Sequence, residues 1–99
     1  MRVRWSELSK KSLANIYDFI FEDSPQNAEM VITTLIALGE SLSDPKIEYS
    51  QDLIINDKRF RFIPKWSYKI IYERTVNEVI ILDVFNVNQN PERLESLKS

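Results

Sequence analysis

The chain has 99 residues, of which 43% are hydrophobic and 28% charged, and its formal net charge is −2. This length predicts a single domain over residues 1–99, and the composition is typical of globular proteins rather than of disordered ones. Cysteine and histidine are both absent. Their absence excludes disulfides, thiolate metal sites, serine–histidine triads and histidine phosphoryl relays, and we expect neither a metal nor a cofactor.

The sequence contains no sign of a membrane or targeting segment. No apolar run approaches the roughly 18–20 residues that a membrane-spanning helix needs. Residues 1–7 do not lead into the apolar core of a signal peptide. We therefore expect a soluble protein of the cytoplasm, with no membrane partner.

The small net charge hides a strongly basic stretch. Residues 58–74 hold six basic side chains and one acid, whereas residues 1–57 carry five more acids than bases. Five aromatic residues lie within the same basic stretch. Basic residues interleaved with aromatics can form a surface that binds nucleic acid or an acidic partner. The alternative is that the cations cover the wet face of a sheet while the aromatics fill its core.

The first part of the chain predicts a short strand and a helix. Residues 3–5 are a candidate edge strand, and Ser6 can cap the helix that follows. Apolar residues from Leu13 to Phe21 recur at the spacing of one face of an amphipathic helix. This helix is expected to end near Ser24, before a proline.

A second, antiparallel helix is predicted directly afterwards. Ser24 can cap it, and Pro25 suits its first position. Its apolar stripe continues to Leu42, which places Gly39, the only glycine, inside the helical pattern. Glycine there costs about 1 kcal/mol relative to alanine. We interpret Gly39 as a point where another element approaches the helix closely.

In the second half the period of the apolar residues changes to two. Residues 52–55 are a weak strand candidate, and residues 59–63 alternate charged and aromatic side chains. We expect Phe60 and Phe62 to face the helices, together with Ile70 and Tyr72. The helix residues expected opposite them are Ile16, Ile20, Val31 and Leu35. The remaining expected elements are strands at 68–73 and 79–85, turns at 64–67 and 75–77, and a short helix or tail over 92–99.

These elements predict an α+β fold, with two antiparallel N-terminal helices packed on a twisted, mainly antiparallel sheet of four to five strands. Asp83 interrupts the apolar strand at 79–85. A buried carboxylate needs a partner, and we expect Arg59, Arg61 or Lys69 to supply it.

Three segments in this order resemble the RelE/ParE superfamily of bacterial toxins. They are VRWSELSKKSLANIYDFIFEDSPQNAEMVI, RFRFIPKWSYKIIYE and VIILDVFNVNQNPERL. The first is similar to the ParE-type strand, helix and proline-started helix. The second resembles an arginine strand that turns into a Tyr-Lys/Arg-Ile-x-Tyr strand, and the third resembles the last strand and its exit.

The resemblance implies the toxin half of a type II toxin–antitoxin pair, with an antitoxin as its partner. It leaves three functions open. ParE-like toxins bind and inhibit DNA gyrase, and RelE-like toxins cleave messenger RNA in the ribosome. A relative without toxicity would bind only an antitoxin. We favour the ParE-like function.

The preference for a toxin without nuclease activity rests on its acid–base groups. In RelE-type toxins, lysines and arginines on the sheet and a late tyrosine or histidine do the chemistry. Arg59, Arg61 and Lys69 match the basic sheet positions of that pattern. Asn86 and Asn88 stand where the nucleases carry basic residues, no tyrosine follows Tyr72, and asparagine cannot exchange a proton near neutral pH. We therefore assign no catalytic residue, and the chain is expected not to be an enzyme.

The partner-binding candidates lie in the basic stretch. They are Arg59, Arg61, Lys65, Trp66 and Lys69. The arginines can bind a phosphate or an acidic antitoxin segment, or can be solvated strand residues, and Lys69 is equally open. Trp66 is expected in a turn, where an exposed indole often contacts a partner. The expected antitoxin segment is acidic and partly apolar.

Overall fold

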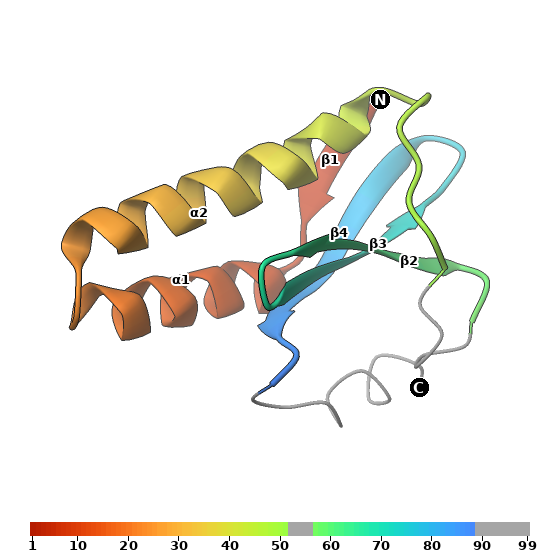
Figure 1. The fold of residues 1–99 in the computed structure, drawn as a ribbon. Coiled ribbons are helices and arrows are strands. Elements are labelled where there is room, and N and C mark those ends of the chain that lie inside the picture. Colours follow the sequence, from red (N-terminus) through yellow and green to blue (C-terminus); the bar gives the residue numbers. More distant parts are fainter. Residues whose placement is uncertain (52–56, 89–99) are drawn as a thin grey trace.

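The computed structural model describes residues 1–51 and 57–88 (Figure 1). The elements run in the order strand, two helices, then three strands. They are β1 (Arg2–Trp5), α1 (Glu7–Phe21), α2 (Pro25–Glu40), the 3-10 turn η1 (Ser41–Ser43), β2 (Phe60–Lys65), β3 (Tyr68–Arg74) and β4 (Glu78–Asn86). The strand expected at 52–55 and the helix or tail expected over 92–99 lie outside the described residues.

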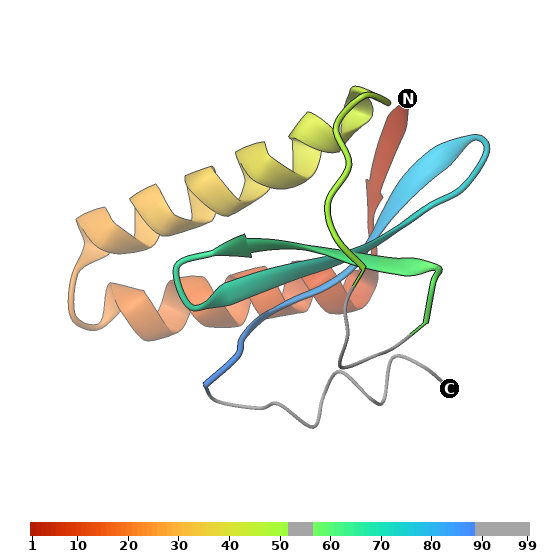
Figure 2. The ribbon, with the colours of Figure 1, turned by 45° about the vertical axis from the view of Figure 1, so that its right-hand side comes forward.

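Four strands form one sheet in the order β1-β4-β3-β2. The β2–β3 and β3–β4 pairs are antiparallel, and β1 joins the far side of β4 in parallel. Both helices lie on the same side of this sheet, antiparallel to each other (Figure 2). The predicted α+β fold, with two helices on a mainly antiparallel sheet, is therefore confirmed.

Each helix begins at the serine predicted to cap it. The Ser6 hydroxyl accepts a hydrogen bond from the Ser9 backbone N–H at 3.0 Å and donates one to the Leu82 carbonyl at 2.8 Å. Ser24 accepts one from the Asn27 N–H at 3.2 Å, and Pro25 follows it at the first helical position. Ser6 thus also ties the start of α1 to the middle of β4.

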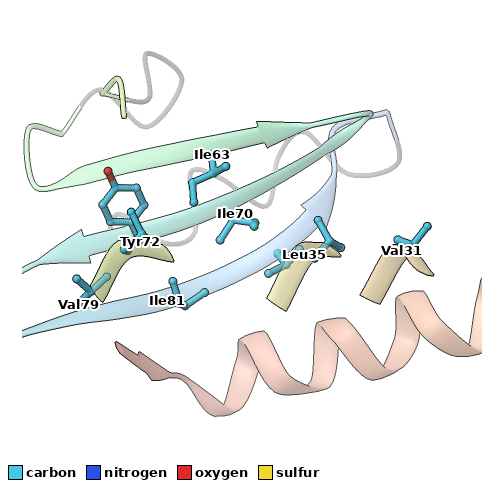
Figure 3. Close-up of a cluster of buried hydrophobic side chains, with 9 residues drawn as sticks. Val31, Leu35, Ile63, Ile70, Tyr72, Val79 and Ile81 are labelled. Carbon is cyan, nitrogen blue, oxygen red and sulfur yellow. The ribbon is translucent and has the colours of Figure 1, made fainter. Parts of the chain in front are cut away.

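The main core lies between the helices and the sheet (Figure 3). Val31 and Leu35 of α2 point toward Ile70 and Tyr72 of β3, and the α1 residues Leu13, Ile16 and Ile20 pack on the same cluster at partial burial. The other buried members are Leu42, Ile63, Val79, Ile81 and Val84. The expected inward direction of Ile70 and Tyr72 is confirmed.

The prediction for the aromatic residues of β2 was wrong. Phe60 and Phe62 pack with Ile71 and Phe85 in a second cluster, and the register pairs Phe62 with Ile71, whereas Ile63 pairs with Ile70. Paired residues of neighbouring strands share a face. Phe60 and Phe62 therefore lie on the face away from the helices. The reason is that this sheet is apolar on both faces, so alternation alone does not show which set meets the helices.

The predicted turn at 64–67 is also shorter than expected. Strand β2 continues through Pro64 to Lys65, and only Trp66 and Ser67 form the loop to β3. Pro64 is tolerated because β2 is an edge strand, where a missing N–H removes no ladder hydrogen bond on the open side. The turn expected at 75–77 lies between β3 and β4 as predicted.

Gly39 is a contact point, as its position inside α2 predicts. A Cβ built on Gly39 would lie 2.5 Å from both Cη2 and Cζ2 of Trp5. The Trp5 indole N–H donates to Glu40 Oε1 at 2.8 Å, which fixes the ring against this helix. The missing side chain therefore lets β1 pack directly on the end of α2.

Arg74 has a structural role that the sequence did not suggest. Its Nη1 donates to the Pro45 carbonyl at 2.9 Å, and its Nη2 donates to the carbonyls of Ile47 at 2.8 Å and Leu42 at 3.2 Å. These carbonyls belong to the chain that leaves α2 and η1. Arg74 thus anchors that connection to the end of β3.

Tyr72 should make the fold sensitive to alkali. Its phenol is fully buried and accepts a hydrogen bond from the Tyr49 N–H at 3.0 Å, and burial raises its pKa above the ordinary value of 10.0. The Tyr72 phenol therefore ionises at a lower pH in the unfolded chain than in the folded protein. As a result, the free energy of unfolding should fall as the pH rises above about 10. Urea unfolding from pH 8 to 11 should show a shallower fall for Tyr72→Phe. Equal slopes for the two proteins above pH 10 would contradict this assignment.

Candidate protein-interaction site

The five partner-binding candidates all lie on or beside the β2–β3 hairpin, but the structure does not bring them to one point. Arg59 precedes β2, and Lys65 and Trp66 lie at its other end, roughly 20 Å away for extended chain. Arg61 pairs with Tyr72 on the helix side of the sheet, whereas Lys69 pairs with Phe85 on the opposite side. They are therefore distributed over both faces and both ends of the hairpin.

Arg59 is held by a neighbouring acid. Its Nη2 lies 2.8 Å from Asp57 Oδ2, and its guanidinium lies 5.0 Å from the centre of the Phe60 ring. The hydrogen bond to Asp57 raises the pKa of Arg59 further above its ordinary value. Arg59 is therefore permanently charged, exposed, and oriented by a salt bridge that solvent screens.

Arg61 is mainly a structural cation. Its Nη1 donates to the Tyr49 carbonyl at 2.7 Å, and its Nε lies 3.3 Å from Glu48 Oε1. Gln51 forms an isolated bridge with Arg61, and the Phe62 N–H donates to the Ser50 carbonyl at 3.2 Å. Arg61 therefore fastens residues 48–51 along the outer edge of β2.

The outer edge of β2 is closed to an added strand. The Phe60 N–H donates to the Asp57 carbonyl and the Phe62 N–H to the Ser50 carbonyl. The next outward position is Pro64, which has no N–H. Satisfied or missing donors on an edge strand discourage pairing with another chain. A partner at this edge would therefore bind through side chains.

Lys69 lies on the sheet face away from the helices. Its Nζ is 4.4 Å from the centre of the Phe62 ring, and its register partners are Pro64 and Phe85. A cation over an aromatic face is attracted by the ring, by about 0.5–1 kcal/mol at exposed sites. The charge of Lys69 is thus held close to the second apolar cluster.

The tip of the hairpin presents Trp66. Its side chain is 55% exposed, and Lys65 Nζ lies 4.8 Å from its ring. The backbone of Trp66 has a positive φ of 54°, unlike every other non-glycine residue in the described part of the chain. The predicted exposure of the indole in a turn is confirmed, and the backbone conformation was not foreseen.

The described residues at the exit of β4, residues 86–88, carry no side chain that exchanges a proton near neutral pH. Asn86 ends the strand, and its Oδ1 accepts a hydrogen bond from the Asn88 N–H at 2.9 Å.

Asp83 is fully buried, and its Oδ1 accepts hydrogen bonds from the Ser12 hydroxyl and from the Val84 N–H at 2.8 Å. Three cations were expected as partners of Asp83. Two of them, Arg59 and Arg61, form ion pairs with other acids.

Residues 1–51 and 57–88 contain neither a metal-binding cluster nor a membrane-spanning helix. No group of three or more His, Cys, Asp or Glu side chains is arranged to hold a metal ion. No helix in these residues is long and apolar enough to span a membrane.

The comparisons with known proteins point to one family. The model of the ParE toxin of the type II toxin–antitoxin system parDE matches residues 3–91. The chain belongs to this ParE toxin family. Membership implies an antitoxin as its partner. The resemblance inferred from the three segments is confirmed.

A solved structure of the chromosomal ParDE toxin–antitoxin system from P. aeruginosa is similar to this ParE-family fold. The TM-score is 0.71 at 16% sequence identity, and the match covers 87% of this chain and 95% of that chain. At this identity the similarity shows the fold. Among curated proteins, no match reaches significance.

Proposed function

We propose that this ParE-family toxin acts by binding DNA gyrase and inhibiting it, and that a cognate antitoxin neutralises it. The observation that supports binding rather than catalysis is the exit of β4. Asn86 and Asn88 hydrogen bond to each other there, and neither can donate or accept a proton in a reaction near neutral pH. The toxin therefore acts as a binding protein.

The contacts of the arginines support the same proposal. Cleavage of RNA through its 2′-hydroxyl needs cations that face the phosphate and a group that takes the proton. Arg61 is bound to Glu48 and to the Tyr49 carbonyl on the helix side, and Arg59 is bound to Asp57. Lys69 lies on the other side of the sheet. These three cations do not converge on one phosphate.

Purified gyrase and a translating ribosome preparation provide the test. The toxin should inhibit supercoiling of relaxed plasmid in a concentration-dependent way, and an equimolar amount of antitoxin should restore it. Mapping of messenger RNA ends should show no new cuts on translating ribosomes. Discrete cuts in the ribosomal A site, with supercoiling unaffected, would contradict the proposal and favour the ribonuclease alternative. Arg59, Arg61 and Lys69 would then be the first residues to replace.

We further propose that the antitoxin binds along the basic hairpin. An acidic, partly apolar segment that folds on binding would contact Arg59, Lys65 and Trp66, while Arg61 and Lys69 add to the positive field. The closed edge of β2 means that this segment contacts side chains instead of extending the sheet. Its charge attraction is exposed to solvent, so salt should screen it beyond about 8–10 Å.

Removing two positive charges from the hairpin should slow antitoxin association. For Arg59→Gln combined with Lys65→Gln, we expect an association rate about tenfold lower at low salt, with a weaker salt dependence. The matched control is Lys10→Gln with Lys11→Gln on α1, which makes the same change in net charge. Stopped-flow mixing measures both rates. Equal slowing by the two pairs would show that only net charge matters.

Arg61 is left unchanged in this experiment for a structural reason. Its guanidinium holds the Tyr49 carbonyl and Glu48, so its replacement would disturb the packing of residues 48–51. A loss of binding in an Arg61 variant would then not separate charge from folding. The ion pair of Arg59 is with Asp57 and the ring contact of Lys65 is with Trp66, both outside residues 48–51.

A further inference from the structure

Trp66 occupies a backbone conformation that a large side chain rarely adopts. Its φ of 54° lies in the region favoured by glycine and, to a lesser extent, asparagine. Two-residue hairpin loops usually use Asn-Gly, Asp-Gly or glycine-containing pairs for this reason. Here the loop is Trp66-Ser67. A strained residue that is not replaced by glycine indicates a requirement for its side chain.

That requirement does not come from the core. The Trp66 indole is 55% exposed and belongs to neither hydrophobic cluster of the structure. The Lys65 ammonium lies over the indole, with its Nζ 4.8 Å from the ring centre. A glycine at this position would make the turn easier and would give up only the partial burial of an indole that belongs to neither cluster. The indole therefore serves a contact outside the folded chain.

The turn that carries Trp66 is held rigidly on both sides. Lys65 pairs with Tyr68 across the hairpin, and Tyr68 pairs with Asn86 of β4. The Ser67 carbonyl accepts a hydrogen bond from the Val87 N–H at 2.9 Å, which ties the loop to the chain leaving β4. A partner that binds this indole therefore has little ordering cost to overcome.

We propose that the toxin binds its target through Trp66. The indole inserts into an apolar pocket of the target, and acidic residues at the rim of that pocket pair with Lys65. This inference rests on the proposed function, because it assumes a target protein. The partner is a folded protein with that pocket preformed, because a rigid anchor that enters a rigid pocket loses little conformational entropy on binding. An antitoxin segment that folds on binding has no such pocket before it binds.

The proposal separates the two partners of the toxin. The target would depend on one tryptophan, because buried aromatic anchors carry a large share of the binding energy at protein interfaces. The antitoxin would depend on charges distributed along the hairpin, from Arg59 to Lys65. An antitoxin that covers the hairpin also covers Trp66. Neutralisation is then competition between antitoxin and target for the same turn.

Three variants test this inference. Trp66→Ala and Trp66→Gly remove the indole, and Val76→Ala truncates the apolar residue in the other hairpin turn, where Val76 is 93% exposed. For each, the measurements are growth arrest on induction, inhibition of gyrase supercoiling, antitoxin affinity and thermal unfolding. Glycine relieves the backbone strain but gives up the covered part of the indole, so Trp66→Gly should unfold close to the wild-type temperature.

We expect both Trp66 variants to need at least about tenfold more protein for the same inhibition of gyrase. Their affinity for antitoxin should fall by a smaller factor than their inhibition of gyrase, because the antitoxin also contacts Arg59 and Lys65, and Val76→Ala should behave as wild type in every measurement. If Trp66→Ala arrests growth and inhibits gyrase as well as wild type does, the proposed role of Trp66 is wrong and the proposed gyrase target is unaffected. Wild-type toxin that arrests growth without affecting gyrase would refute the proposed target, and growth arrest by the variants would then decide the role of Trp66. If the wild-type protein neither arrests growth nor inhibits gyrase, both the proposed target and the proposed role of Trp66 are wrong.

Discussion

Replacing Arg74 with methionine is expected to lower the free energy of unfolding by about 3 kcal/mol. The side chain donates hydrogen bonds to three carbonyls, those of Leu42, Pro45 and Ile47. Hydrogen bonds to charged groups contribute about 1.5–3 kcal/mol each, although such terms are not additive. Methionine keeps much of the apolar stem but leaves the three carbonyls without this donor. Urea unfolding monitored by tryptophan fluorescence measures the loss.

Arg4→Met is the matched control for that experiment. Arg4 forms one ion pair with Glu78, at 2.7 Å, with 48% of the arginine side chain exposed. Exposed pairs of this kind contribute about 0–1 kcal/mol, so the same substitution should have a much smaller effect there. The Arg74 variant should also be cut more readily by protease within residues 44–50. Equal losses of stability in the two variants would show that the carbonyl contacts of Arg74 contribute little.

Gly39→Ala should destabilise the fold even though alanine is the better helix former. The new Cβ would lie 2.5 Å from two ring carbons of Trp5. Relief of this overlap costs about 1–3 kcal/mol in a packed core, against about 1 kcal/mol gained from helix propensity. We expect a net loss of up to about 2 kcal/mol by urea unfolding.

A double-mutant cycle identifies the cause of that loss. Trp5→Phe removes the part of the ring that Gly39 accommodates, so alanine at position 39 should then be neutral or stabilising. The interaction energy between the two sites should be about 1–3 kcal/mol, the cost of the overlap, because helix propensity is the same in both backgrounds. If Gly39→Ala costs the same in the Trp5→Phe background, the contact with the indole is not the reason for the glycine.

The features of the fold that were predicted correctly depend on local patterns. The caps Ser6 and Ser24, the two helical stripes and the inward direction of Ile70 and Tyr72 follow from residues close together in the sequence. The direction of Phe60 and Phe62 does not. Alternation assigns residues of a strand to two sets, but in a sheet with an apolar cluster on each face it does not show which set meets the helices.

The candidate site was located in the sequence, but the partners of its cations were not. The pairing of Arg59 with Asp57 spans two residues and follows a local pattern. Glu48, which pairs with Arg61, and the carbonyls bound by Arg74 are 13 or more residues away in the sequence and become visible only in the fold. The exposure of Trp66 was predicted from its turn, but its positive φ was not, because no glycine or asparagine marks it.

The parallel pairing of the first strand has a consequence for how the toxin is made in the cell. Arg2–Trp5 find their partners only at Glu78–Ile81, more than 70 residues later in the chain. While the protein is being synthesised, its first strand stays unpaired until residues 78–81 have emerged. Contacts so distant in sequence also slow folding. A nascent or truncated chain that stops before β4 therefore has neither a complete sheet nor the Val87 N–H that holds the hairpin turn. A chain that ends before Glu78 is thus expected to leave β1 unpaired and the turn of Trp66 and Ser67 without its hydrogen bond to Val87.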